Sequence, residues 1–175
     1  VVPGGVDVDL FHPRNQDEAR TRLGLNGDKV ILCVGRLDPL KGVDLALASA
    51  ALLEDREHVN VVLVGGDLEK DPEVQRLADL AHALGISDHV RFEGAVPHDE
   101  LPWYYSAADV LMVPSYYESF GLVALEAMAC GTPVVAARVG GLPSLVRDGE
   151  TGYLVPWHCP EPFAERLEVL LAHDD

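Results

Sequence analysis

The chain has 175 residues, 48% of them apolar, and a formal net charge of −16 at pH 7. This length is that of one domain, which buries roughly 70% of the surface that its unfolded chain exposes. The charge repels polyanions and argues against nucleic acid and acidic membrane surfaces as partners. No apolar run reaches the roughly 18 residues of a membrane-spanning helix, and no signal peptide opens the sequence, so we expect a cytoplasmic protein.

The cysteines and histidines do not indicate a metal site. Three cysteines form no C-x-x-C pair, and seven histidines are scattered without the spacing of metal ligands. Two of the cysteines lie among apolar or small residues and are expected to be buried thiols. We therefore predict neither a disulfide nor a metal, and no cofactor.

In chain order, a short helix is expected at 16–23, closed by Gly24 and followed by a turn at Gly27 and Asp28. From residue 30 onwards, strand-length apolar runs alternate with segments of helical period. Strands are expected at 30–34, 59–64, 90–92, 110–113, 134–137 and 152–155. Helices are expected at 43–54, 72–84, 98–108, 120–129, 142–147 and from 161 onwards.

Continuously apolar strands separated by helices are typical of a parallel sheet that is covered on both faces. The sequence therefore predicts a single α/β domain with a doubly wound, mostly parallel six-stranded sheet. Ligands of such domains bind outside the carboxyl ends of the strands, where the strand order reverses. The loops after the strands are therefore the places to look for a functional site.

The loop after the first expected strand, residues 35–42, reads GRLDPLKG. It carries Arg36 and Lys41, and a planar guanidinium together with an ammonium point charge suits a diphosphate. Taken alone, each of these two residues is more often a solvated surface cation than a ligand-binding group.

The stretch 114–131 reads PSYYESFGLVALEAMACG and is expected to run from a strand through a loop into a helix. A helix that begins at Phe120 leaves the amides of residues 120–123 without intrahelical acceptors, at the positive end of the helix dipole. Such an end binds phosphate. Gly121 has no Cβ, so a ligand can approach the main chain there.

Two glutamates bracket this expected helix start. Glu118 precedes it, and Glu126 lies roughly 8 to 9 Å further along the axis. At this separation the two carboxylates can accept hydrogen bonds from different groups of hydroxyls, as in a nucleotide sugar, which has a diphosphate between two sugars. The alternative is a surface loop in which Glu118 only favours the helix end, with Glu126 solvated on an amphipathic helix.

The run ESFGLVALE at 118–126, the G-R-L-x-x-x-K-G loop and a G-V-D-x-x-x-F segment at 5–11 resemble the retaining glycosyltransferases of family 4, which have the two-domain GT-B fold. Within that family this sequence is similar to the sucrose-phosphate synthase and mycothiol glycosyltransferase branch. Where many relatives carry glutamate after G-G-x-P, this chain has Ser144.

The resemblance implies a role for individual residues. Glu118 would contact the transferred sugar, Arg36 and Lys41 would bind the donor diphosphate and stabilise the leaving group, and these three form the expected catalytic set. Glu126 would bind the ribose hydroxyls. The full expected donor-binding set is Gly35, Arg36, Lys41, Val96, Leu101, Glu118, Ser119, Phe120, Gly121, Leu122, Val123 and Glu126.

The nucleobase would be held by the main chain near Val96 with Leu101 beside it. The donor would be a UDP-, ADP- or GDP-linked hexose, used without a metal. A retaining enzyme of this kind needs no pair of carboxylates across the sugar, unlike hydrolases.

The resemblance also implies that residues 1–175 are one C-terminal nucleotide-sugar-binding domain of a larger enzyme, with 1–13 as a remnant of the interdomain linker. The chain starts without methionine and ends in a helical run, as a piece of a longer protein would. Its own N-terminal acceptor-binding domain would be the second partner, and any peripheral membrane contact would be made through that domain. The isolated chain would bind donor without transferring the sugar.

Two further interpretations stay open from the sequence. One is a sugar phosphorylase or a nucleotide-sugar epimerase of the same fold. The other is a non-enzymatic doubly wound module, such as a signalling receiver. A receiver requires an acidic cluster with a lysine at the strand ends, whereas the loops here offer Arg36, Lys41 and Glu118.

Overall fold

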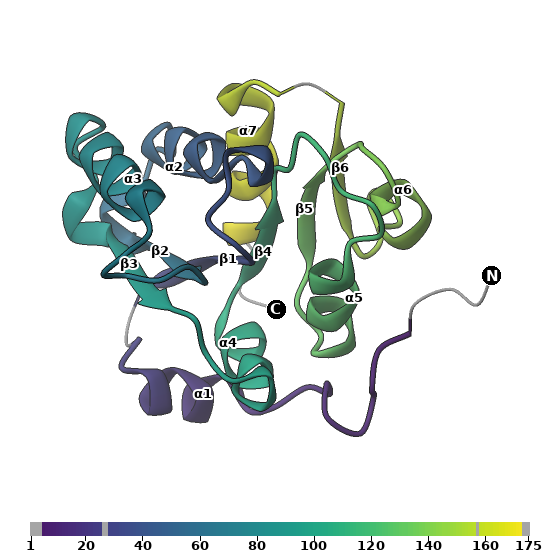
Figure 1. Cartoon of the computed structure of the whole chain (residues 1–175). Coiled ribbons are helices and arrows are strands. Elements are labelled where there is room, and N and C mark those ends of the chain that lie inside the picture. Colours follow the sequence, from purple (N-terminus) through teal and green to yellow (C-terminus); the bar gives the residue numbers. More distant parts are fainter. Residues whose placement is uncertain (1–4, 26–27, 157, 173–175) are drawn as a thin grey trace.

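The computed structural model describes residues 5–25, 28–156 and 158–172. Within these residues six strands form one sheet in the order β3-β2-β1-β4-β5-β6, and every pair of neighbours is parallel (Figure 1). The strands are β1 (Lys29–Val34), β2 (Val59–Val64), β3 (Val90–Gly94), β4 (Val110–Val113), β5 (Val134–Ala137) and β6 (Gly152–Val155). The predicted doubly wound parallel sheet is confirmed.

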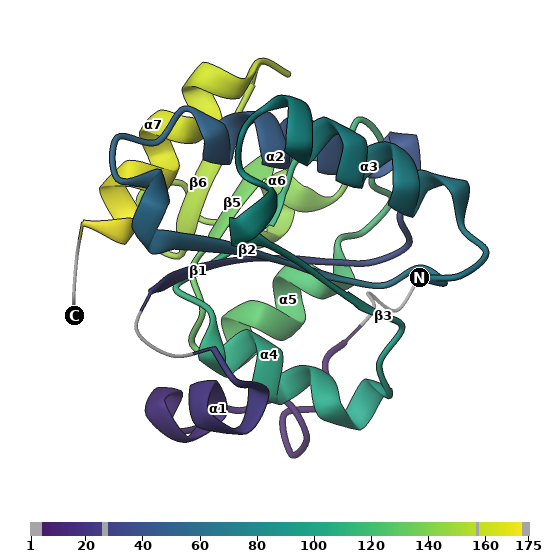
Figure 2. The same ribbon diagram turned by 90° about the vertical axis from the view of Figure 1, so that its left-hand side faces the viewer.

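Helices cover both faces of the sheet (Figure 2). One face carries α2 (Val43–Ala51), α3 (Pro72–Ala83) and α7 (Pro160–Leu171). The other carries α1 (Gln16–Leu23), α4 (Leu101–Ala107) and α5 (Leu122–Ala129), while α6 (Leu142–Leu145) contacts α5. Short 3₁₀ turns precede several elements, among them η1 (Pro39–Lys41) and η4 (His98–Glu100).

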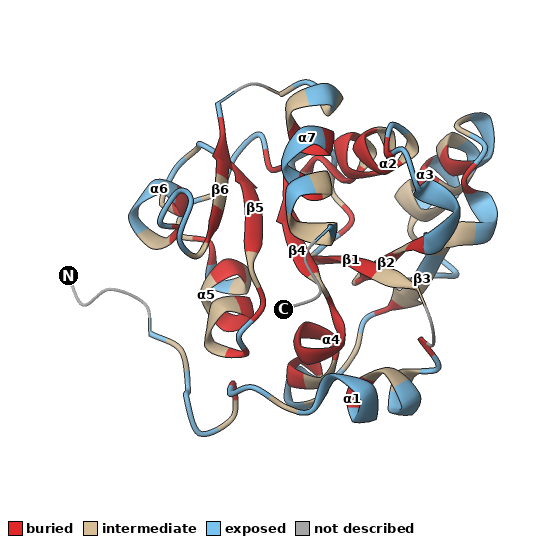
Figure 3. Cartoon of the chain, turned by 180° about the vertical axis from the view of Figure 1, so that it is seen from behind, coloured by how far each residue is buried: buried red, intermediate tan, exposed pale blue. Residues whose placement is uncertain are grey.

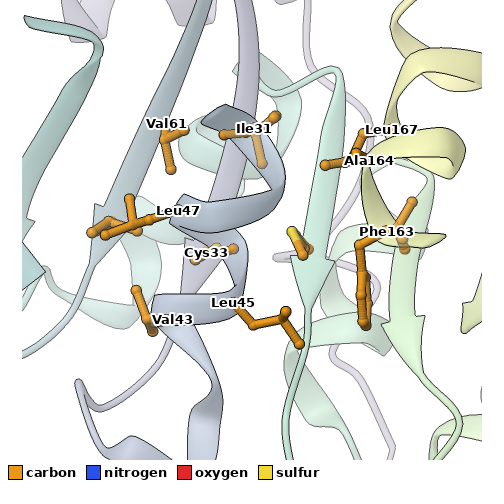
Figure 4. Close-up of a cluster of buried hydrophobic side chains, with 14 of the residues drawn as sticks. Ile31, Cys33, Val43, Leu45, Leu47, Val61, Phe163, Ala164 and Leu167 are labelled. Carbon is orange, nitrogen blue, oxygen red and sulfur yellow. The ribbon is translucent and has the colours of Figure 1, made fainter. Parts of the chain in front are cut away.

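The first hydrophobic core lies between the sheet and α2, α3 and α7. Side chains of β1 and β2, such as Ile31 and Val61, meet Leu47 of α2 and Phe163 of α7 in this layer (Figure 4). These strands are apolar on both faces because a second core lies on their other side.

The second core contains Tyr105 of α4 and Ala124 of α5, together with Phe11 from the segment before α1. Phe11 is 2% exposed, so the expected linker segment contributes a core side chain; residues 1–4 lie outside the described part of the chain. Seen from behind, β4 and β5 are buried while the outward faces of α1 and α3 are exposed (Figure 3).

Several predicted boundaries are wrong by a few residues. The helix expected from Phe120 begins at Leu122, because Gly121 has a left-handed φ of 93° and ends the preceding loop. The helix expected at 98–108 divides into η4 and α4, since Pro102 has no amide to donate to a carbonyl one turn earlier. The helix expected at 43–54 ends at Ala51, and the turn expected at Gly27 lies outside the described residues.

β1 pairs with β2 on one side and with β4 on the other, so the strand order reverses between β1 and β4. The two crossovers leave this point toward opposite faces, and the loops after β1 and β4 diverge at the carboxyl edge of the sheet. The expected Arg36 and Lys41 lie on the first of these loops and Glu118 on the second.

The loops after β1 and β4 touch at Gly42. Gly42 has a φ of 66°, and an added Cβ would lie 2.3 Å from the carbonyl oxygen of Pro114. Tyr116 on the second loop also donates its amide to the carbonyl of Leu40 at 2.9 Å. The backbone of η1 is therefore held against the backbone that leads to Glu118.

We predict that Phe163→Ala lowers the free energy of unfolding by about 3 to 5 kcal/mol, because a fully buried ring is removed from the first core. Urea unfolding followed by circular dichroism measures the change. Val169→Ala on the same helix, at a site that is 38% exposed, is the control and should change stability by less than about 0.5 kcal/mol. Equal effects of the two substitutions would contradict the placement of α7.

We predict that Gly42→Ala destabilises the chain more than Gly85→Ala does. Both glycines have positive φ, 66° and 72°, which costs an L-residue about 1 to 2 kcal/mol. Only at Gly42 does the new Cβ meet backbone, and forcing the loops apart adds about 1 to 3 kcal/mol. Urea midpoints of the two variants give the difference, and an equal loss would refute the close contact of the loops.

Candidate functional site

A cavity of about 280 Å³ opens at the carboxyl ends of β1 and β4. Its volume is close to the lower end of the range of small-molecule sites, about 300 Å³. The expected site residues that line it are Gly35, Arg36, Lys41, Glu118, Ser119, Phe120, Gly121, Leu122 and Val123. The structure therefore brings both basic residues, the first glutamate and the helix end to one place.

The closest polar contact in the cavity joins the two loops. Lys41 Nζ donates to Glu118 Oε2 at 2.7 Å, and the side chains are 30% and 11% exposed. Glu118 is thus largely withdrawn from water and has a cation as its partner. Between such partly buried charges, removing one leaves the other without compensation, which costs more than the pair itself contributes.

Local sequence explains how Lys41 reaches this position. Asp38 accepts a hydrogen bond from the amide of Leu40 at 2.8 Å and caps η1, in which Pro39 occupies the first position. Gly42 ends the turn in a left-handed conformation. The 3₁₀ turn was not expected from the sequence, yet its Asp-Pro start and Gly end carry the usual capping signals.

The α5 end faces the same cavity. The carbonyl of Gly121 accepts hydrogen bonds from Ala124 at 3.0 Å and Leu125 at 3.2 Å, so the amides of Leu122 and Val123 precede the intrahelical bonds. Their N–H groups and the helix dipole give this end a partial positive charge. The expected anion-binding end is therefore two residues further along the chain than predicted.

Arg36 lines the cavity, but it is not held in it. Its side chain is 83% exposed, and its guanidinium lies 3.7 Å from the carboxylate of Asp38. An exposed ion pair of this kind contributes at most about 1 kcal/mol, so the guanidinium is free to turn toward an anion.

Glu126 lies behind the cavity and does not line it. From the observed start of α5 it is four residues along the helix, roughly 6 Å along the axis. It is 9% exposed, and its carboxylate accepts hydrogen bonds from Tyr105 at 2.7 Å and His98 at 3.1 Å. The alternative of a solvated Glu126 is therefore wrong.

Tyr105 is a neutral donor in this group. Burial, and after it the nearby Glu126 carboxylate, raises the pKa of Tyr105 well above its ordinary value. The hydroxyl therefore keeps its proton, and the carboxylate that it faces has a permanent donor.

Val96 and Leu101 do not line the cavity. Val96 is partly buried against the second core, and Leu101 belongs to that core with 9% exposure. Both flank His98, whose ring reaches Glu126, so this loop lies beside the second glutamate.

Ser144, which stands where many relatives carry glutamate, donates its hydroxyl to the carbonyl of Gly141 at 2.6 Å and does not line the cavity.

Cys33 lines the inner wall of the cavity, and burial raises the pKa of its thiol to about 12, which keeps it protonated. Cys33 and Cys130 are buried as expected for two of the cysteines, and Cys159 is exposed.

Among the described residues, histidine, cysteine and acidic side chains form no group of three or more that could hold a metal ion. In the same part of the chain, no helix is both long and apolar enough to span a membrane.

Sequence reasoning missed Tyr105 and His98 as partners of Glu126. Tyr105 is fully buried in the second core. Its contact with Glu126 joins residues 21 positions apart on different helices, and one sequence contains no signal for such a pair.

Comparison with known proteins agrees with this geometry. Residues 15–175 match the family described as Glycosyl transferases group 1. The chain is 50% identical over 178 residues to the D-inositol 3-phosphate glycosyltransferase of Acidothermus cellulolyticus, a match that covers 98% of this chain and 40% of that protein. The chain thus spans about two fifths of the length of this relative.

Two solved structures are similar as well. Sucrose-phosphate synthase from Thermosynechococcus elongatus is 41% identical with a TM-score of 0.89, covering 98% of this chain and 43% of that one. Anabaena HepE, solved in complex with UDP-glucose, is 31% identical with a TM-score of 0.85, covering 94% and 45%. The expected resemblance to the sucrose-phosphate synthase and mycothiol branch is confirmed. The fold, the converging loops and these matches together show that the chain belongs to the glycosyl transferases group 1 family.

Proposed function

We propose that this chain is the donor-binding, C-terminal domain of a retaining glycosyltransferase of family 4 that uses a nucleotide-diphospho-sugar. The observation that carries the proposal is the convergence of Lys41, Glu118 and the amino end of α5 on one cavity. HepE, a structural neighbour at 31% identity, has been solved with UDP-glucose, which supports a nucleotide-sugar ligand.

In this proposal the diphosphate occupies the cavity. Its oxygens accept hydrogen bonds from the amides of Leu122 and Val123 and from Lys41, and Arg36 turns in from solvent. These groups are positive where charge develops on the leaving nucleoside diphosphate, so they stabilise the transition state more than the ground state. No metal is needed for this stabilisation.

The two glutamates bind the two sugars of the donor. Glu118 accepts hydrogen bonds from hydroxyls of the transferred hexose, and Glu126 accepts from the ribose hydroxyls. The cavity of about 280 Å³ has room for the diphosphate and part of the hexose. The nucleoside then extends past His98 toward Val96 and Leu101, outside the cavity.

Transfer with retention exchanges two bonds on one face of the sugar. The bond from the anomeric carbon to the diphosphate oxygen breaks, and a bond to the acceptor oxygen forms on the same side. The acceptor proton passes to the departing phosphate oxygen. Acceptor groups would come from an N-terminal domain, so we expect this chain to bind donor and to transfer nothing by itself.

The length of the relatives supports a second domain, since the chain covers about 40% of the Acidothermus protein. Residues 1–13 would then lead in from the interdomain linker. The cytoplasmic location remains a prediction.

A phosphorylase or epimerase of the same fold is a weaker candidate, because the G-R-L-x-x-x-K-G loop and the spaced glutamates fit a glycosyl donor. A receiver is weaker still, because Lys41 faces a glutamate and the α5 end in place of an acidic cluster.

We predict that Lys41→Ala weakens binding of the nucleotide sugar by about tenfold or more, because a charge-assisted hydrogen bond to phosphate is worth about 1.5 to 3 kcal/mol. Isothermal titration with UDP-, ADP- and GDP-linked hexoses measures the change and identifies the base. Lys29→Ala removes the same charge at the amino end of β1, roughly 17 Å away along the strand, and should leave the affinity unchanged. If none of the three donors binds, or if Lys41→Ala binds like the unmodified chain, the proposed site is refuted.

A further inference from the structure

The two oxygens of the Glu126 carboxylate have partners of opposite character. Oε2 accepts from the Tyr105 hydroxyl at 2.7 Å, and Tyr105 is completely buried. Oε1 contacts His98 Nε2 at 3.1 Å, and the His98 side chain is 65% exposed. One oxygen is therefore held from inside the protein and the other from the solvent side.

The inner partner is fixed in position. Tyr105 lies on α4, and its main-chain carbonyl accepts a hydrogen bond from Thr132 Oγ1 at 2.6 Å, just past the end of α5. Its ring lies 6.1 Å from that of Phe11 in the second core. Tyr105 is thus bonded to the residue just past α5, the helix that carries Glu126. Its hydroxyl holds the carboxylate of Glu126 through Oε2.

The outer partner is held more weakly. His98 lies on η4, one short 3₁₀ turn, and its ring packs edge-to-face with that of Phe11 at a centroid distance of 5.0 Å. An ionised carboxylate only accepts hydrogen bonds, so Nε2 is the donor in this contact. Since most of the imidazole faces water, its rotation away from Glu126 exposes little additional protein surface.

We propose that Tyr105 is a positioning residue that aims Glu126 at the donor ribose, and that His98 occupies the outer oxygen only until a ribose hydroxyl displaces it. This inference rests on the proposed function, in which Glu126 binds the ribose. Tyr105 acts through Glu126 and does not touch the ligand. His98 competes with the ligand for Oε1.

The proposal predicts opposite effects at two neighbouring contacts of one carboxylate. Tyr105→Phe removes the inner donor and frees the carboxylate to rotate, so binding of UDP should weaken about tenfold, the effect of losing one hydrogen bond to a charged group. His98→Ala removes the competitor, so binding of UDP should strengthen by about twofold to fivefold, as expected for an exposed pair. Isothermal titration of the 175-residue chain measures both.

Inorganic pyrophosphate separates positioning from loss of structure. It engages the Lys41 and α5 end and has no ribose, so Tyr105→Phe should leave its affinity within twofold. The matched control is Tyr104→Phe, which removes the neighbouring hydroxyl from Glu93 at 3.2 Å and should leave UDP binding unchanged. In a Glu126→Gln background, Tyr105→Phe should have little further effect on UDP, because both changes act through one contact.

The outcomes distinguish this inference from the proposed function. If none of UDP, ADP, GDP and pyrophosphate binds the unmodified chain, the proposed function fails. If UDP binds and Glu126→Gln weakens it while Tyr105→Phe does not, or if Tyr105→Phe weakens pyrophosphate equally, the positioning role is overturned and the donor site stands. Equal or weaker UDP binding by His98→Ala overturns the displacement step.

Discussion

The ion pair between Lys41 and Glu118 depends on the contact of two loops that leave the sheet at its switch point. β1 and β4 are neighbours only because the chain, after adding β2 and β3 on one side, returns to the other side of β1. Gly42 then lets the backbone of η1 approach Pro114, which places the ammonium group 2.7 Å from the carboxylate. The cavity, its positive helix end and its acidic wall all follow from that contact.

The two glutamates differ in what compensates their charge, and this difference agrees with the separate roles that we propose for them. Glu118 is paired with a cation, so a ligand that reaches Lys41 also changes the partner of Glu118. Glu126 is satisfied by a buried tyrosine and an exposed histidine in place of an arginine or lysine. It can therefore receive neutral hydroxyls without breaking an ion pair. In the proposed function, one helix thus presents a carboxylate to the ribose hydroxyls and, one turn earlier, an amino end to the diphosphate.

Much of the fold could be read from local pattern. The continuous apolar runs at 30–34 and in β4 require cover on both faces, and the alternating helices provide it, so the parallel sheet followed from periodicity alone. The loop residues Arg36, Lys41 and Glu118 were also identified correctly as neighbours, because the carboxyl ends of parallel strands share one edge. Errors were confined to element ends, where single residues decide: Gly121 moved the start of α5 and Pro102 divided the helix before β4.

The sequence by itself determined the α/β class, the edge of the sheet at which the cavity opens and the residue types available there, because these depend on short-range periodicity and on the chemistry of each side chain. Only the tertiary structure decided that Lys41 pairs with Glu118, that Glu126 is buried against Tyr105 and His98, and that Val96 and Leu101 lie outside the cavity. Those contacts join residues on different crossovers, whose distance is set by how helices pack on the sheet. Spacing along the chain carries no information about that packing distance.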